Sequence, residues 1–120
     1  MKPIVSESVY KVLYNLLHKV KSPEGKQLGQ ELSKAQIVKD EELNKKVVTI
    51  NSEVEFIEED LNKPIRLKIV LPEDADLSQR KISIFAPISI ALIGFRESYS
   101  FNWLLPSGIK KLKILKVINH

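Results

Sequence analysis

The chain has 120 residues, no cysteine, 43% hydrophobic residues and a formal net charge of +4 at pH 7. This length allows one modest hydrophobic core, and the lack of cysteine excludes disulfides and thiolate metal sites as support for it. No apolar run approaches the roughly 20 residues that span a bilayer, and the N-terminus lacks a signal-peptide pattern. We therefore expect a cytoplasmic protein without a membrane partner. The small positive charge does not by itself indicate nucleic-acid binding.

Residues 1–44 predict a short helical arm. Apolar residues recur at helical spacing between Ser6 and Lys21, which indicates an amphipathic helix with one buried stripe. Ser22 and Pro23 suit the N-cap and the first position of a second helix. The short turn predicts that the two helices pack antiparallel. The apolar side of the second helix consists of Leu28, Leu32 and Ala35, extended by Ile37 or Val38.

Residues 45–120 predict a second, β-rich domain, because the hydrophobic period changes to two. The turn residues at 60–64 predict that the strands on either side of them pair as an antiparallel hairpin. A short apolar helix is expected from Pro87 to Ile93, with Gly94 as its C-terminal cap. The strands are expected at residues 47–50, 53–58, 65–71, 81–85, 100–105 and 110–118.

The last strand has two patterns that leave alternatives open. Leu112 and Ile114 share one face while Leu115 and Val117 share the other, so the strand is either buried on both sides or contains a β-bulge. Lysines also recur along this strand. They either form a basic edge for a partner or keep an edge strand from aggregating. These lysines are Lys110, Lys111, Lys113 and Lys116.

Aromatic residues alternate along the predicted strands. Phe56, Phe101 and Trp103 are expected in the core, the alternative being a ligand pocket. Phe85 and Phe95 flank the apolar helix and are either buried against the sheet or exposed to a partner. We find no Ser-His-Asp set, phosphate-binding glycine loop or histidine cluster in the sequence. No catalytic residue, metal or other cofactor is therefore predicted.

Five separated segments carry a family resemblance. They are residues 31–36 (ELSKAQ), 47–54 (VVTINSEV), 70–76 (VLPEDAD), 82–94 (ISIFAP followed by ALIG) and 103–108 (WLLPSG). In this order they resemble the GreA/GreB family of bacterial transcription factors, and within it the short-armed regulators of nucleoside diphosphate kinase. The likeness extends from about residue 32 to residue 118.

The resemblance implies an α+β protein whose second domain has the fold of the FK506-binding proteins, a twisted antiparallel sheet with one short helix packed on it. In the cleavage factors GreA and GreB this domain docks on the rim of the secondary channel of RNA polymerase. The docking segment matches Phe85, Ala86 and Pro87, and we expect the contact to include Ile88 and Ser89. Phe85 and Ala86 depart from the acidic or amide residue and serine of the cleavage factors.

The arm argues against transcript cleavage. A helix over residues 6–21 spans roughly 24 Å at 1.5 Å per residue, which is much shorter than the coiled coil of the cleavage factors. Its tip presents Pro23 and a single acid, Glu24, whereas cleavage requires carboxylates that hold Mg²⁺. The acidic residues 40–42 lie at the base of the arm, as is typical of a solvated linker. The sequence therefore predicts a non-catalytic regulator that binds bacterial RNA polymerase and competes with GreA and GreB.

Two alternative functions remain at this stage. The first is an enzyme, either a prolyl isomerase of the FK506-binding type or a residual transcript-cleavage factor, although a fold alone is a weak argument for activity. The second is a module that binds another protein or, weakly, a nucleic acid through the basic edge. A steep dependence of nucleic-acid binding on salt would favour the second.

Overall fold

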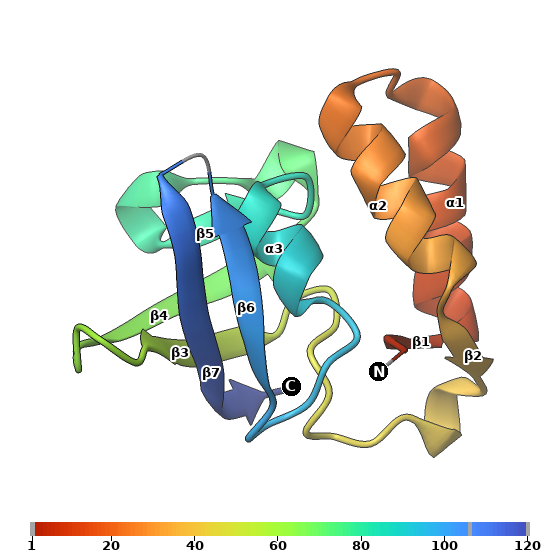
Figure 1. The fold of residues 1–120 in the computed structure, drawn as a ribbon. Coiled ribbons are helices and arrows are strands. Elements are labelled where there is room, and N and C mark those ends of the chain that lie inside the picture. The colour runs from red at the N-terminus through yellow and green to blue at the C-terminus, as the bar shows by residue number, and fades with distance from the viewer. Residues whose placement is uncertain (1, 106, 120) are drawn as a thin grey trace.

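The computed structural model describes residues 2–105 and 107–119 and has an α+β fold (Figure 1). The α-helices are α1 (Glu7–Lys19), α2 (Pro23–Ser33) and α3 (Pro87–Leu92). The short 3-10 helices are η1 (Asp40–Glu42), η2 (Pro72–Asp74) and η3 (Leu77–Gln79). The strands are β1 (Ile4–Ser6), β2 (Gln36–Val38), β3 (Glu53–Glu58), β4 (Pro64–Val70), β5 (Lys81–Ser83), β6 (Ser100–Leu105) and β7 (Gly108–Ile118). None of the helices in the described part of the chain is long and apolar enough to cross a membrane.

Helices α1 and α2 form the predicted helical hairpin and run in opposite directions (Figure 1). Each helix begins at a serine that satisfies a free backbone amide of the first turn. The Ser6 hydroxyl accepts a hydrogen bond from the Val9 amide at 3.3 Å, and the Ser22 hydroxyl accepts one from the Gly25 amide at 3.1 Å. The facing apolar stripes bury Leu13, Leu28 and Leu32.

A small sheet that the sequence did not predict joins the two ends of the arm. Strands β1 and β2 pair in parallel, with Ile4 opposite Gln36. The prediction that Ile37 or Val38 extends the apolar side of α2 was therefore wrong, because α2 ends at Ser33 and Ile37 lies in β2 with 45% of its surface exposed. The pairing joins segments about thirty residues apart, so no local pattern reveals it.

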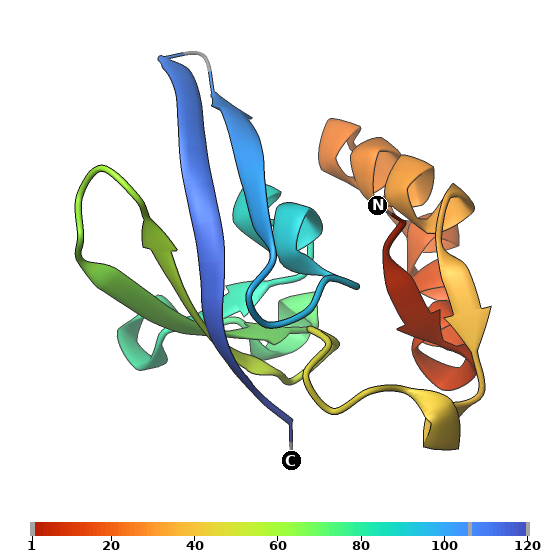
Figure 2. The same ribbon diagram turned by 60° about the horizontal axis from the view of Figure 1, so that its bottom comes forward.

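The main sheet has the strand order β5-β4-β3-β7-β6, with α3 packed against it (Figure 2). The predicted β3–β4 hairpin is confirmed as antiparallel. The sheet is antiparallel, as predicted, at three of its four strand pairs, and β5 pairs in parallel with β4 at one edge. Two 3-10 turns, η2 and η3, carry the chain back between β4 and β5, and this return makes the parallel pairing possible.

A β-bulge resolves the two alternatives for the last strand. Glu55 lies opposite Lys116, but the next residue, Phe56, lies opposite Ile114. Leu115 is thus the extra residue of β7 and is 36% exposed, whereas Ile114 is fully buried. One additional residue changes the face of every side chain beyond it. This shift places Leu112, Ile114 and Val117 in the same core.

The predicted strand at residues 47–50 was wrong. Val47 and Val48 are buried, but among the described residues their segment is hydrogen-bonded to the loop after α3 and does not form a regular strand. The Val48 amide donates to the Phe95 carbonyl at 2.8 Å, and the Gly94 amide donates to the Val48 carbonyl at 2.9 Å. Asn51 provides the predicted bend with φ of 71°.

The buried side chain of Ser52 stabilises the loop of residues 45–52. Its fully buried hydroxyl accepts a hydrogen bond from the Thr49 amide at 2.8 Å and donates to the Asn119 side chain. The Asn119 amide group in turn donates to the carbonyls of Lys45 and Val47, both at 2.8 Å. The end of β7 thereby holds residues 45–52 in place, which satisfies polar groups that would otherwise be buried unpaired.

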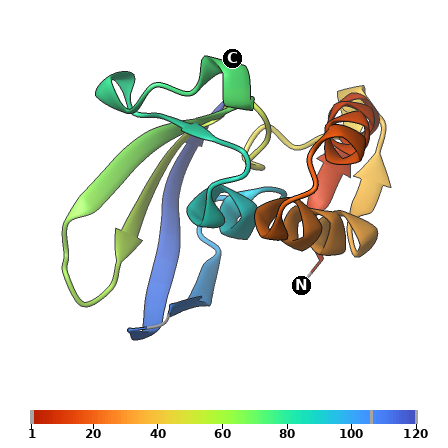
Figure 3. The same cartoon turned by 90° about the horizontal axis from the view of Figure 1, so that it is seen from above.

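The arm and the sheet share one hydrophobic core. Helix α2 approaches α3 at the junction (Figure 3), and Leu13 and Leu28 belong to the same buried cluster as Val54 and Ile114. Gly94 adds a second junction, since its carbonyl accepts a hydrogen bond from the Ile4 amide at 2.9 Å. These contacts fix the orientation of the arm relative to the start of α3.

Candidate functional site

The segment expected to contact polymerase forms a sharp corner between β5 and α3. The Ser83 hydroxyl accepts a hydrogen bond from the Phe85 amide at 3.1 Å, and the Ser83 carbonyl accepts one from the Ala86 amide at 2.9 Å. Pro87 follows as the first residue of α3, where its fixed φ suits a helix start and its missing amide costs nothing. Phe85 and Ala86 are half-buried and Pro87 is exposed.

Ile88 and Ser89 do not join that surface. Ile88 is 8% exposed and Ser89 is fully buried, so both lie beneath the corner. The Ser89 hydroxyl has no hydrogen-bond partner among the described residues. The structure therefore brings three of the five expected contact residues to the surface and places the other two where they support it.

The predicted arm tip lies at the turn between α1 and α2, at the far end of the hairpin from β1 and β2 (Figure 1). Pro23 and Glu24 are both exposed there. The adjacent exposed residues Lys21 and Lys26 are cationic, so Glu24 is the single acid in residues 20–27. With 13 residues, α1 rises about 20 Å at 1.5 Å per residue.

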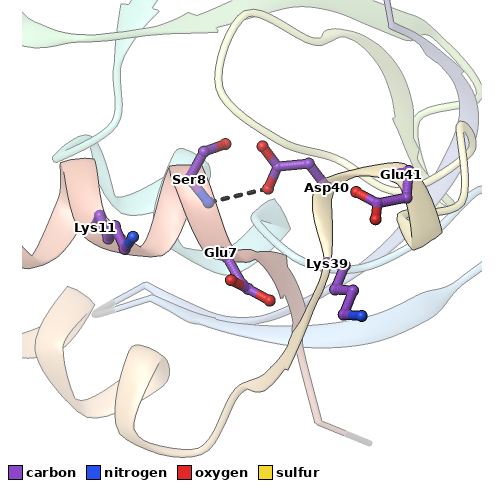
Figure 4. Close-up of a pocket in the computed structure, with 6 residues that line it drawn as sticks. All are labelled: Glu7, Ser8, Lys11, Lys39, Asp40 and Glu41. Carbon is purple, nitrogen blue, oxygen red and sulfur yellow. Dashed lines mark hydrogen bonds between the residues drawn. The ribbon is translucent and has the colours of Figure 1, made fainter.

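A polar recess of about 420 Å³ lies where the arm meets the connector (Figure 4). Asp40 of η1 accepts a hydrogen bond from the Ser8 amide in the first turn of α1 at 3.0 Å. The backbone and side-chain hydrogen bonds from Ser8, with a smaller effect of Lys11, hold the pKa of Asp40 below its ordinary value. Asp40 therefore acts as a second cap of α1. In residues 2–105 and 107–119, no group of three or more metal-ligating side chains is placed to hold an ion.

The lysine-bearing strand β7 was expected at the edge of the sheet, and this expectation was wrong. Strand β7 lies between β3 and β6, and its middle part pairs with both. Lys113 lies opposite a residue of each neighbour, whereas Lys110 and Lys111 lie opposite β6 alone and Lys116 lies opposite β3 alone. Two of them pair with neighbouring acids. The Lys110 Nζ lies 3.2 Å from the Glu58 Oε1, and the Lys111 Nζ lies 3.8 Å from the Glu59 Oε2. Local ion pairs with Glu58 and Glu59 account for two of the four lysines, Lys110 and Lys111.

The aromatic residues divide into two groups. Phe56 is 5% exposed and belongs to the core, as predicted. Phe85 and Phe95 are half-buried, and so are Phe101 and Trp103, which line a groove of about 330 Å³ between α2, α3 and β6. The groove also contains acidic and aromatic side chains that the sequence analysis did not single out, namely Glu31 and Tyr99. They are distant along the chain, so alternation within one strand gives no signal for them.

Comparison with known proteins decides the family. Residues 43–119 match the family described as "Transcription elongation factor, GreA/GreB, C-term". The chain belongs to the GreA/GreB family. A transcription elongation factor GreA from Acetivibrio thermocellus is 33% identical over 91 residues, which are 76% of this chain and 57% of that protein. The regulator of nucleoside diphosphate kinase of Escherichia coli is 35% identical over 82 residues, which are 68% of this chain and 60% of that protein.

A solved structure extends the GreA/GreB likeness over the arm. The prokaryotic transcription elongation factor GreA/GreB from Nitrosomonas europaea is 34% identical, has a TM-score of 0.82 and is covered over 99% of both chains. The aligned part of this chain spans about three fifths of the length of the curated GreA/GreB relatives it matches. The family is one of transcription factors rather than classical enzymes. The corner at Phe85–Pro87 lies inside the family match, whereas α1 and α2 lie outside it.

Proposed function

We propose that this protein binds bacterial RNA polymerase near the secondary channel and regulates transcription without catalysing transcript cleavage. The single observation that carries the proposal is the corner before α3, within the GreA/GreB match, where Phe85, Ala86 and Pro87 reach the surface. The two hydrogen bonds to Ser83 preorganise this corner, which reduces the entropy lost on docking. An apolar contact centred on Phe85 and Pro87 suits a partner surface that buries them.

The geometry of the arm supports a non-catalytic role. A tip with the single acid Glu24, flanked by Lys21 and Lys26, offers too few carboxylates to share a catalytic Mg²⁺. Helix α1 also gives a reach of only about 20 Å. The protein would therefore occupy the docking site of GreA and GreB without supplying their chemistry, and it would compete with them.

The test is binding of fluorescently labelled protein to bacterial core RNA polymerase, with unlabelled GreA as competitor. We expect saturable binding that GreA displaces. The substitutions Phe85→Asp and Pro87→Ala, made separately, should each weaken binding about tenfold or more, because both remove apolar area from the corner. The matched control is Leu77→Ser, which changes a residue that is 81% exposed in η3, outside the corner, and should leave binding unchanged.

Circular dichroism of each variant separates loss of docking from loss of folding, which matters for the half-buried Phe85. Equal binding by the corner variants and the wild type would refute the docking surface, and absence of binding at micromolar concentrations would refute the partner. A second assay measures transcript cleavage in arrested elongation complexes. No stimulation above polymerase alone is expected, and stimulation that Glu24→Gln abolishes would make the protein a cleavage factor after all.

A further inference from the structure

The groove between the arm and the sheet is lined by aromatic side chains and by polar side chains. One wall consists of aromatic rings and the other of polar side chains on α2, and Ile90 and Ala91 of α3 also line the groove. Its volume of about 330 Å³ is enough for one long side chain of a partner but small for a folded element. The lining residues that carry the argument are Gln27, Glu31, Tyr99, Phe101, Asn102 and Trp103.

The aromatic wall is a row of parallel rings. The Phe95 and Tyr99 rings stack with centroids 4.6 Å apart and planes 6° apart. Tyr99 and Phe101 continue the row at 5.8 Å and 16°. Trp103 follows Phe101 at the next position on the same face of β6. All four side chains are half-buried, so the row is held by the core yet remains accessible from the groove.

Glu31 supplies a negative charge to the groove. It lies in the last turns of α2, is half-buried, and makes no ion pair within residues 2–105 and 107–119. Gln27 lies one helical turn earlier and also lines the groove. Asn102 lines the groove from β6, but alternation along the strand turns its side chain to the opposite face from Phe101 and Trp103. No lysine, arginine or histidine lines this groove within the described residues. A carboxylate partly removed from water without a counter-ion favours a cationic ligand.

We propose that this groove binds an arginine side chain presented by a partner protein. The planar guanidinium stacks on an aromatic ring, while its fork of N–H donors fits the Glu31 carboxylate and the Gln27 side-chain amide. A lysine ammonium would pair with the Glu31 charge, but it has no planar group to stack on a ring and no fork of N–H donors. A nucleic acid would stack its bases on the same rings, yet its phosphates would be repelled by Glu31. The chemistry on both walls therefore selects arginine on a protein.

An arginine in this position would touch both parts of the molecule. Its guanidinium would contact Glu31 of α2, and its plane would lie against Trp103 of β6 or the outer face of Phe101, because Phe95 and Phe101 already stack on Tyr99. The ligand would thus bridge the arm and the sheet next to the existing contact between α2 and α3. This interaction does not depend on the docking corner at Phe85–Pro87.

Trp103 is the sole tryptophan of the chain and lies in the groove, so its fluorescence reports directly on occupancy. The probes are three blocked tripeptides, Gly-Arg-Gly, Gly-citrulline-Gly and Gly-Lys-Gly, titrated into the full chain. Citrulline has the shape of arginine without its charge. We expect a saturable change with the arginine peptide, at least about fivefold weaker binding of the lysine peptide, and no saturation with the citrulline peptide.

Glu31→Gln removes the carboxylate with almost no change in shape, and it should weaken binding of the arginine peptide about fivefold. The matched control is Glu24→Gln, which removes the same charge from the exposed start of the same helix and should have no effect. Phe101→Leu should also weaken binding while keeping the tryptophan reporter. Equal responses to the arginine and citrulline peptides, unchanged binding in Glu31→Gln, or no saturation by about 20 mM peptide would each overturn the proposal. So would a saturable response to a thymidine hexanucleotide that persists in Glu31→Gln.

Discussion

Replacing Gly94 by alanine should destabilise the protein far more than a glycine cap alone would suggest. Gly94 has φ of +85°, and an added Cβ would lie 2.4 Å from the Pro3 Cβ and 2.9 Å from the Ile4 nitrogen. The backbone conformation costs alanine about 1 kcal/mol. Relieving the overlap requires the N-terminal segment to move, which strains or breaks the bond from the Ile4 amide to the Gly94 carbonyl. Together these effects should lower the free energy of unfolding by about 3–4 kcal/mol.

Gly108 provides the matched control, because it has φ of +132° but no atom within 4 Å of an added Cβ. Gly108→Ala should therefore cost only about 1–2 kcal/mol, from backbone strain alone. Urea unfolding followed by circular dichroism measures both variants. In Gly94→Ala, amide hydrogen exchange should also accelerate in β1 and β2, because the displaced segment contains β1, which pairs with β2. Equal losses of stability in the two variants, or unchanged protection of β1 and β2, would refute the reasoning.

Three further predictions concern the core, a buried hydroxyl and a cap. Ile114→Ala should lower the free energy of unfolding in urea by about 2–5 kcal/mol and Leu115→Ala by less than about 1 kcal/mol, since only Ile114 faces the core at the bulge. Similar losses of stability in the two variants would contradict the strand register at the bulge. Ser52→Ala should lower the same free energy by about 1–3 kcal/mol, because it leaves buried polar groups unpaired. An unchanged stability would contradict the hydrogen-bond network around Ser52. The stabilising contribution of Asp40 should be complete above the ordinary aspartate pKa of 3.8 and disappear as pH falls through its lowered folded pKa. An NMR titration of the Asp40 carboxyl that gives an unshifted pKa, with no change at the Ser8 amide, would contradict the cap.

The sequence analysis succeeded where one element carries its own signal. A few neighbouring residues were enough to predict the serine cap and proline start of α2, the alternation along β3 and β4, and the Pro87 start of α3. Caps, turns and hydrophobic periods are local properties, so a single sequence contains them. The same analysis placed the candidate docking corner correctly between a strand and a helix.

It failed where two distant segments meet. The parallel pairing of β1 with β2 was not predicted, and residues 47–50 were predicted as a strand although they are tied to the loop at Gly94–Arg96. The groove was missed for the same reason, since Glu31 and Trp103 come from elements about seventy residues apart. Ile88 and Ser89 were expected in the polymerase contact because they follow the segment that resembles the docking residues, and periodicity cannot orient a helix of six residues that is apolar almost all round.

The sequence by itself determined the α+β class, the helical arm, the main hairpin and the family, because these depend on local patterns and on the order of short motifs. Tertiary structure alone decided that β7 lies between β3 and β6 in the sheet, and that a bulge sends Leu115 outward. It also decided which face of α3 is buried and what Gly94 touches. Strand order and helix orientation result from the simultaneous burial of several faces, and no single segment of the chain contains that information.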